Sequence, residues 1–316
     1  PPHADRASMY DRLGQIAVFL FYSRLRAGEP IDDIIEGLIT PRLTGLALRP
    51  DDPMLLLGTA EGYEAHGYAI WLRGGDPLPA LRQAVAYTDR AVAILPEDPY
   101  LAVDNAQVQV YYASLQIIGG RTPAEALASA ADTVDALASQ ALSERMRRSV
   151  DTLRVRHGTQ MLRWWLLLDG PAPDWTASDR ALEQIRPLAD AVRHPFTRQQ
   201  LVEHLLWRTL AEHLSGRNAA ASLDEAARGV TLLMEAGHEP ARRWAERSVV
   251  ERLRALLATD PAQREAHLAA AATARYAAVT ANPWLDRELD TWDRLLSPTA
   301  VDPSPRVLRA PAVRPN

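Results

Sequence analysis

Two similar stretches, "ALRPDDPMLL" at 47–56 and "AILPEDPYLA" at 93–102, constrain the fold of this chain more than any other feature of its sequence. Each is an apolar run interrupted by Pro, acidic residues and a second Pro, and the second prolines are Pro53 and Pro99. Proline is tolerated in the first turn of a helix, and an Asp before it can cap the free N–H groups of that turn. Both stretches therefore predict turns between helices.

The same kind of break recurs at regular intervals. Comparable positions follow at Ser143, Pro195, Pro240 and Pro283, and the intervals from Pro53 onward are 46, 44, 52, 45 and 43 residues. A second series lies between them: "AGEP" at 27–30, "GGDP" at 74–77, "GGRTP" at 119–123, "DGPAP" at 169–173, "LSGRN" at 214–218 and "ATDP" at 258–261. Self-similarity at this period is typical of stacked helical hairpins. We predict an all-α solenoid of about six hairpins, with a period of about 45 residues, over residues 1–296.

Three segments depart from this regularity. Pro41 falls inside the predicted second helix of the first period, which predicts a kink or an early end there. The last 20 residues, 297–316, hold five prolines and are predicted to form an extended tail. The chain begins "PPHAD" rather than with Met, so we expect it to be a piece of a longer protein.

Composition excludes several classes of function. All 35 basic residues are Arg, so the chain lacks the Lys of a P-loop, a protein kinase or a Schiff-base enzyme, and it has no Cys for a thiolate nucleophile or a Cys-based metal site. A net charge of −5 argues against a nucleic-acid partner. The apolar stretch "QIAVFLFY" at 15–22 is too short to span a bilayer, so we predict no membrane partner and a cytoplasmic location.

One stretch resembles a known family. "ALRQAVAYTDRAVAILPEDP" resembles the second helix and trailing turn of a tetratricopeptide repeat, with Ala84 and Ala91 at the family's small-residue positions and Pro96 at its closing proline. Leu57 and Gly58 resemble the family's Leu-Gly pair in the first helix. The separation from Gly58 to Ala84 is 26 residues, longer than in the family's repeat. The long repeat resembles the arrays that follow the kinase domain in some bacterial serine/threonine kinases.

This resemblance implies a right-handed array that binds proteins or peptides in a groove lined by first helices and does no chemistry. Carried over to this sequence, the groove positions are Tyr63, His66, Asn105, Gln109 and Tyr112. Periodicity alone adds Arg156, His204 and Arg208. Asn105 matches one position of the carboxylate clamp of some family members, but Leu101 stands where the clamp has Lys, which argues against a chaperone-tail receptor.

An arginine-rich stretch offers a further partner-binding candidate. "ERMRRSVDTLRVRHG" at 144–158 includes Arg145, which could bind carboxylate or phosphate groups of an acidic partner. The alternative is a solvated face whose arginines pair with local acids such as Glu144. A second cluster, between Arg242 and Arg254, makes the first less distinctive.

Possible chemical sites are weaker. Asp32, Asp33 and Glu36 have the spacing of the magnesium motif of terpene synthases, but acids at a helix start also cap free N–H groups, and we favour capping. No two His have the i, i+4 spacing of a metalloprotease helix, and no "GxSxG" elbow or Gly-rich dinucleotide turn occurs. The sequence thus predicts no catalytic residue, metal or cofactor.

Three functional hypotheses follow. The first is a non-enzymatic protein-interaction scaffold, a regulatory or docking part of a bacterial signalling protein, whose partner is a protein or peptide. The second is a sensory array of a transcription activator or signalling ATPase that binds a small ligand. The third is a magnesium-dependent, all-α enzyme of the terpene-synthase kind. The sequence leaves the oligomeric state open.

Overall fold

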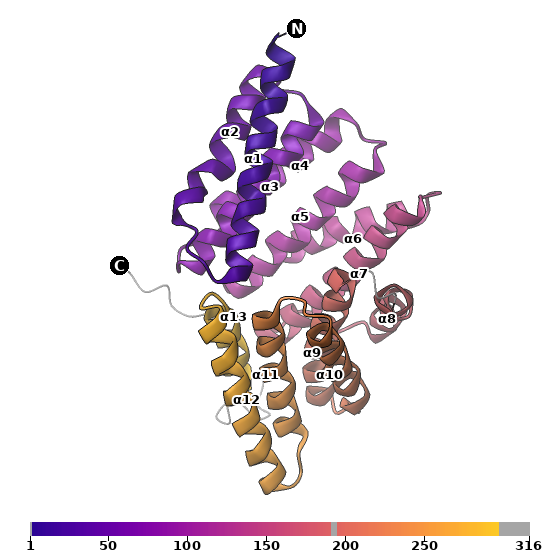
Figure 1. Ribbon diagram of the computed structural model, residues 1–316. Helices are drawn as coiled ribbons and strands as arrows, with labels where there is room; N and C mark the ends of the chain where they lie inside the picture. The colour runs from indigo at the N-terminus through magenta and orange to yellow at the C-terminus, as the bar shows by residue number, and fades with distance from the viewer. Residues whose placement is uncertain (1, 191–194, 297–316) are drawn as a thin grey trace. The chain divides into compact units, whose positions relative to one another are not determined.

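The computed structural model describes residues 2–190 and 195–296, and every regular element among them is helical (Figure 1). The predicted all-α class is confirmed. The predicted tail, 297–316, lies outside the described residues. None of the described helices combines the length and the apolar character needed to cross a membrane.

The described chain divides into two compact units. Unit 1 comprises the start of the chain to Leu25 together with Glu29–Leu153, and unit 2 comprises Arg26–Gly28 and the described residues from Arg154 onward. The helices of unit 1 are α1 (Pro2–Ala27), a short 3₁₀ helix η1 (Asp32–Ile34), α2 (Ile35–Leu48), α3 (Pro53–Leu72), α4 (Leu78–Ile94), α5 (Pro99–Ile118) and α6 (Ala124–Ala138). The boundary falls within α7 (Glu144–Leu168). Unit 2 continues with α8 (Trp175–Asp190), α9 (Pro195–Leu214), α10 (Ala220–Glu235), α11 (Pro240–Leu257), α12 (Pro261–Ala281) and α13 (Leu285–Leu295).

The helices begin and end where the two series of breaks predict. Helices α3, α5, α9 and α11 each begin at the predicted proline. The Asp52 carboxylate accepts hydrogen bonds from the backbone N–H groups of Met54 and Leu55, at 3.0 and 3.2 Å, and Asp98 caps α5 in the same way. The repeated Pro-acid-Pro stretches are therefore helix-start signals, as predicted.

Glycine closes several of these helices. Gly74 and Gly120 have φ angles of 89° and 71°, in the left-handed region that an L side chain rarely adopts. Their N–H groups bond back to the carbonyls of Trp71 and Ile117, which ends α3 and α5. The chain can therefore reverse direction within a few residues, and consecutive helices pack side by side.

Pro41 does not end its helix. Helix α2 continues through it from Ile35 to Leu48, so the prediction of an early end is wrong. Leu38 and Arg42, on either side of Pro41, are both fully buried. Tertiary packing of these side chains holds the helix in place of the backbone hydrogen bond that proline cannot donate.

The packing of α1, α2 and α3 is built around the buried side chain of Arg42. A Cβ on Gly14 of α1 would lie 2.3 Å from Arg42 Cγ, and one on Gly58 of α3 would lie 2.3 Å from Arg42 Nη1. Two glycines on facing helices thus leave the space that the arginine fills. Its Nη2 donates to the Glu61 carboxylate, 3.1 Å away, so the charge keeps a partner at the edge of the packing.

The apolar core differs between the units. In unit 1 it is divided among several clusters of buried side chains, one of which joins Ala7 of α1 to Leu56 of α3 and Leu101 of α5. In unit 2 one connected cluster includes side chains from α7 to α13, from Val155 to Trp292. Each unit therefore buries its own core.

Replacing Gly62 of α3 by Ala should destabilise unit 1. The new Cβ would lie 2.2 Å from the carbonyl oxygen of Leu38, so the α2 and α3 backbones must separate. We expect a loss of about 2 kcal/mol in the free energy of unfolding, measured by urea denaturation. The control is Gly37→Ala in α2, where the nearest atom is 3.4 Å away and helix propensity should add roughly 0.5–1 kcal/mol. Equal stabilities of the two variants would contradict this account of the packing.

Candidate functional site

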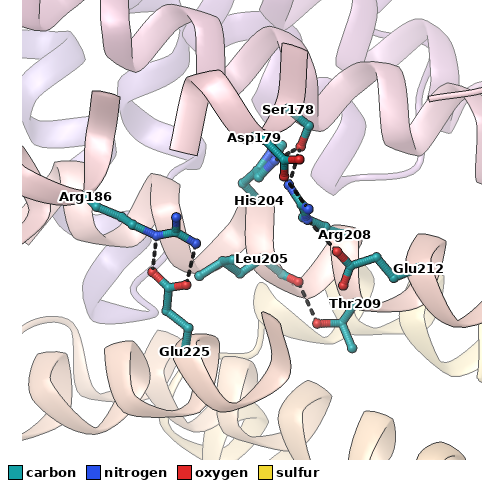
Figure 2. A network of polar contacts seen from close by, with 9 residues as sticks. All are labelled: Ser178, Asp179, Arg186, His204, Leu205, Arg208, Thr209, Glu212 and Glu225. Carbon is teal, nitrogen blue, oxygen red and sulfur yellow. Dashed lines mark hydrogen bonds and ion pairs between the residues drawn. The ribbon is translucent and has the colours of Figure 1, made fainter. Parts of the chain in front are cut away.

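A buried polar network joins α7, α8 and α9 in unit 2, and Figure 2 shows most of its members. The imidazole of His204 has no exposed surface. Its Nε2 lies 3.0 Å from Ser178 Oγ of α8, and its Nδ1 lies 3.1 Å from Thr159 Oγ1 of α7. His204, predicted as a groove residue, therefore faces the interior between three helices.

Arg208, one turn further along α9, extends the network toward the surface (Figure 2). Its Nη1 donates to Ser178 Oγ at 3.0 Å, its Nε to Glu212 Oε1 at 2.7 Å, and its Nη2 lies 2.6 Å from Asp179 Oδ1. The guanidinium also lies 5.6 Å from the ring centroid of Trp175. Since Arg208 is itself buried, the prediction that it lines an open groove does not fit its position.

The hydrogen-bond pattern assigns the protons of this network. Thr159 Oγ1 donates to the carbonyl of Val155 at 2.8 Å, so it accepts from the Nδ1–H of His204. The Nε2 atom is then an acceptor for the Ser178 hydroxyl. A Ser–His hydrogen bond is the geometry of an activated nucleophile, yet burial, followed by the charge of Arg208, lowers the pKa of His204 to about 3. A histidine this weakly basic, with its serine also buried, pins helices together rather than removing a proton from a substrate.

The low pKa of His204 predicts a pH dependence of stability. Between about pH 6.5 and pH 3 the unfolded chain binds a proton that the folded chain does not, so stability falls as the pH falls. From pH 6.5 to 5 the loss should be about 1.6 kcal/mol relative to a His204→Gln variant. Glu246, whose pKa burial raises to about 7, contributes the opposite slope in both proteins, so it cancels in the comparison.

The measurement is urea unfolding at several pH values, followed by tryptophan fluorescence. Trp71 is the one tryptophan of unit 1 and the other seven lie in unit 2, so the signal reports on unit 2. A His213→Gln variant in the same helix should keep the slope of the original chain. Parallel pH profiles for the original chain and His204→Gln would contradict the assignment.

In unit 1 two of the predicted groove residues, Tyr63 and Asn105, contact α4 from the helices on either side of it. Tyr63 of α3 stacks on Tyr87 of α4, with ring centroids 5.6 Å apart. Asn105 Nδ2 of α5 donates to Thr88 Oγ1 and Asp89 Oδ1 of α4, at 3.0 and 2.7 Å. Asn105 and Gln109 are both buried. The groove assignment of Asn105 and Gln109 therefore does not fit, because their side chains lie in the interior.

His66 and Tyr112 are half-buried. Burial, followed by the nearby charge of Arg73, lowers the pKa of His66. Its Nδ1 is buried and has no hydrogen-bond partner among the described residues.

A different set of side chains marks the side on which α3 and α5 meet. We call it the α3–α5 face, and it consists of Glu61, Tyr68, Tyr100, Asp104 and Tyr111. Glu61 and Tyr100 are exposed, and the Tyr100 hydroxyl hydrogen-bonds to Asp104. The rings of Tyr68 and Tyr111 lie 6.4 Å apart. On each helix the members are spaced by four or seven residues, so they share one side.

The electrostatics of the α3–α5 face are distinctive. Burial, followed by the negative charge of Glu61, raises the pKa of Asp104 to about 6. Arg145, which is exposed at the start of α7, acts on Tyr100 from nearby and opposes the rise in its pKa. Of the nine predicted partner-binding residues, Arg145 is thus the one that the structure brings to this face. The sequence analysis missed the face. The groove positions taken from the tetratricopeptide resemblance lie on the neighbouring side of each helix.

The rest of the arginine-rich stretch is partly engaged within the chain. Arg148 lies 3.8 Å from Glu144, and Arg154 Nη1 donates to Gln184 at 3.1 Å. Arg156 is half-buried and also interacts within the chain. The Arg148–Glu144 pair follows the alternative in which the arginines pair with local acids, whereas the bond of Arg154 joins α7 to α8.

In unit 2 the second arginine cluster holds the last helix, α13. Arg242 and Arg252 of α11 pair with Glu288 and Asp293, at 2.9 and 2.7 Å. Trp292 of α13 packs against Trp207 of α9, with ring centroids 4.1 Å apart. An amphipathic helix is thus held by an aromatic anchor and arginine–carboxylate pairs.

The proposed magnesium motif is neutralised by arginine. Asp33 pairs with Arg24 at 2.5 Å and Asp32 pairs with Arg73. Ile31, at the N-cap of η1, makes no side-chain capping bond, while Asp32 and Asp33 lie in the first turn, where negative charge stabilises a helix start. Among the described residues, no group of three His, Cys, Asp or Glu side chains is placed to hold a metal ion.

Comparison of the chain with family models, with curated proteins and with solved structures finds no match. The resemblance to tetratricopeptide repeats therefore stays a prediction, and the geometry of the chain itself carries the functional argument.

Proposed function

We propose that this chain is a non-enzymatic protein-interaction scaffold, a right-handed, tetratricopeptide-like array of helical hairpins whose partner segment binds to the α3–α5 face. A regulatory role in a bacterial signalling protein, in the cytoplasm, is part of the same proposal. The observation that carries it is the convergence of two carboxylates and three tyrosines on one side of two first helices, with Glu61 and Tyr100 exposed.

The chemistry of the face defines the partner. Carboxylates pair with Arg and Lys, and tyrosine rings attract the same cations through their faces. Glu61 is exposed although the buried Arg42 pairs with it, and Asp104 lies close enough to feel its charge, so a cation of the partner could share both carboxylates. We therefore infer a partner peptide or helix that carries basic side chains next to apolar ones.

The way unit 2 holds α13 supports this binding mode. There, first helices α9 and α11 accept an amphipathic helix through Trp292 and two acidic side chains. A scaffold that binds a partner helix at α3 and α5 would use the same kinds of interaction. There the scaffold would supply the carboxylates and the partner the basic side chains.

The charge of the face can be removed without changing its shape. The double variant Glu61→Gln/Asp104→Asn keeps hydrogen-bonding groups next to Arg42 and Tyr100 but loses both carboxylates. Because Glu61 pairs with the buried Arg42, urea unfolding of the variant checks that unit 1 remains folded, and the single variant Asp104→Asn, which leaves that pair intact, should also reduce recovery. We expect partner recovery in affinity capture, followed by mass spectrometry, to fall at least about tenfold, because two charge pairs are lost. The control is Glu125→Gln/Asp132→Asn, which removes two exposed acids from α6. Equal recovery by both variants would refute the assignment of the face.

Partner affinity should also depend on pH. The pKa of Asp104 is raised to about 6, so its carboxylate is charged at pH 7.5 and largely neutral at pH 5. A basic partner should bind about fivefold more weakly at pH 5, which corresponds to the loss of roughly 1 kcal/mol from one pair. Titration by fluorescence anisotropy measures this, and Asp104→Asn should lose this component of the pH dependence. A basic partner that bound more tightly at pH 5 would contradict the proposal.

A further inference from the structure

Helix α1 has two apolar sides. On one side Ala7, Gly14 and Phe21, each seven residues apart, are buried. Gly14 leaves the space for Arg42, and the Ala7 carbonyl lies 3.3 Å from where a Cβ on Gly45 would be. This side packs within unit 1.

The other side exposes a stripe of large apolar side chains. Its members are Met9, Leu13, Ile16, Phe19 and Leu20, which are between 40% and 69% exposed. Met9, Leu13, Ile16 and Leu20 are spaced by four, three and four residues, and this spacing places them in one narrow line along the helix. It is the spacing of a coiled-coil seam, in which an identical seam can pack.

The stripe is large for the exposed side of a helix. Five large side chains, about half exposed, amount to roughly 400–500 Å² of apolar surface, as large as the largest patch on a typical monomer. A stable interface buries about 800 Å² on each partner, so the stripe would supply more than half of one.

We propose that α1 pairs with α1 of a second copy of this chain, antiparallel, across a two-fold axis between Gly14 and Gln15. In this alignment Met9 packs against Leu20 of the second copy, and Leu13 packs against its Ile16. The symmetry makes each of these contacts twice, which is the self-complementarity that a two-fold dimer requires.

The flanks of the stripe favour the antiparallel arrangement. Arg12 and Phe19 border it on one side and are exposed, whereas Tyr10, Ala17 and Arg24 border it on the other and are partly buried in unit 1. Antiparallel pairing brings the two open flanks together. Arg12 then faces the ring of Phe19 of the second copy, which is a favourable cation–π contact.

Sedimentation equilibrium of the full chain tests the pairing. At micromolar concentration we expect twice the 34.9 kDa mass of one chain. Leu13→Glu/Ile16→Glu should raise the dissociation constant at least about a hundredfold, because four carboxylates would enter the seam. The matched control Leu268→Glu replaces an exposed leucine of α12 and should remain dimeric. A monomeric original chain, or a dimer that the double variant retains, would overturn the proposal.

Disulfide formation tests the direction and does not depend on a disruptive variant. The chain has no Cys, so introduced cysteines report only on the pair. Met9→Cys protein mixed with Leu20→Cys protein should crosslink on oxidation. Met9→Cys alone should not, because its two copies would lie about 16 Å apart along the helices. Self-crosslinking of Met9→Cys without the mixed product would overturn the antiparallel arrangement. Loss of the dimer would leave the α3–α5 face intact, so failure here is distinct from failure of the proposed function.

Discussion

Arginine side chains buried between helices are the interaction on which the packing of both units depends. In the described part of the chain, Arg42, Arg163, Arg208 and Arg243 are each less than a tenth exposed. A buried charge is costly unless partners surround it, and removing a partner from such a group destabilises a protein by about 3–5 kcal/mol. For Arg42, Arg163 and Arg208 a carboxylate or aromatic ring of a neighbouring helix is such a partner, whereas Arg243 pairs with Glu246 of its own helix.

The two units use this interaction differently. In unit 1, Gly14 and Gly58 leave the space for Arg42, so the helices approach closely around a single long side chain. In unit 2, Arg163 lies 5.2 Å from the ring centroid of Trp207, and Arg208 bonds to Ser178 and Glu212. Both arrangements occupy the interior, and the face that we propose for binding lies on the outer sides of α3 and α5.

The positions of the helices could be predicted because the signals that set them are local. Pro53 with Asp52, or Gly74 at the end of α3, acts on the backbone within one turn, and such signals need no knowledge of the rest of the fold. Pro41 misled the prediction because packing on both sides of it outweighs its local effect. Asp32 and Asp33 lie in the first turn of η1, but their pairing with arginines distant in sequence could not be predicted from a local signal.

The candidate site could be predicted only in part. His204 and Asn105 lie on the buried side of their helices rather than on the exposed side. Which side of a helix is buried depends on how the helix is rotated against its neighbours, and the sequence of one helix does not give that rotation. That Glu61 lies near Asp104 could not be predicted, because the two residues belong to different hairpins and the sequence does not give the distance between them. Arg145 could be proposed from sequence because a charged cluster at a helix start is visible there, whereas its nearness to Tyr100 was not.

Site-specific photocrosslinking in cells tests the central claim most directly, which is that a protein partner binds the α3–α5 face. A photoreactive amino acid would replace Tyr100, and in a second protein it would replace Tyr276 of α12, which is more exposed at 75%. We predict a discrete crosslinked partner from position 100 and none from position 276. Equal crosslinking at both positions, or crosslinking from position 276 alone, would contradict the claim.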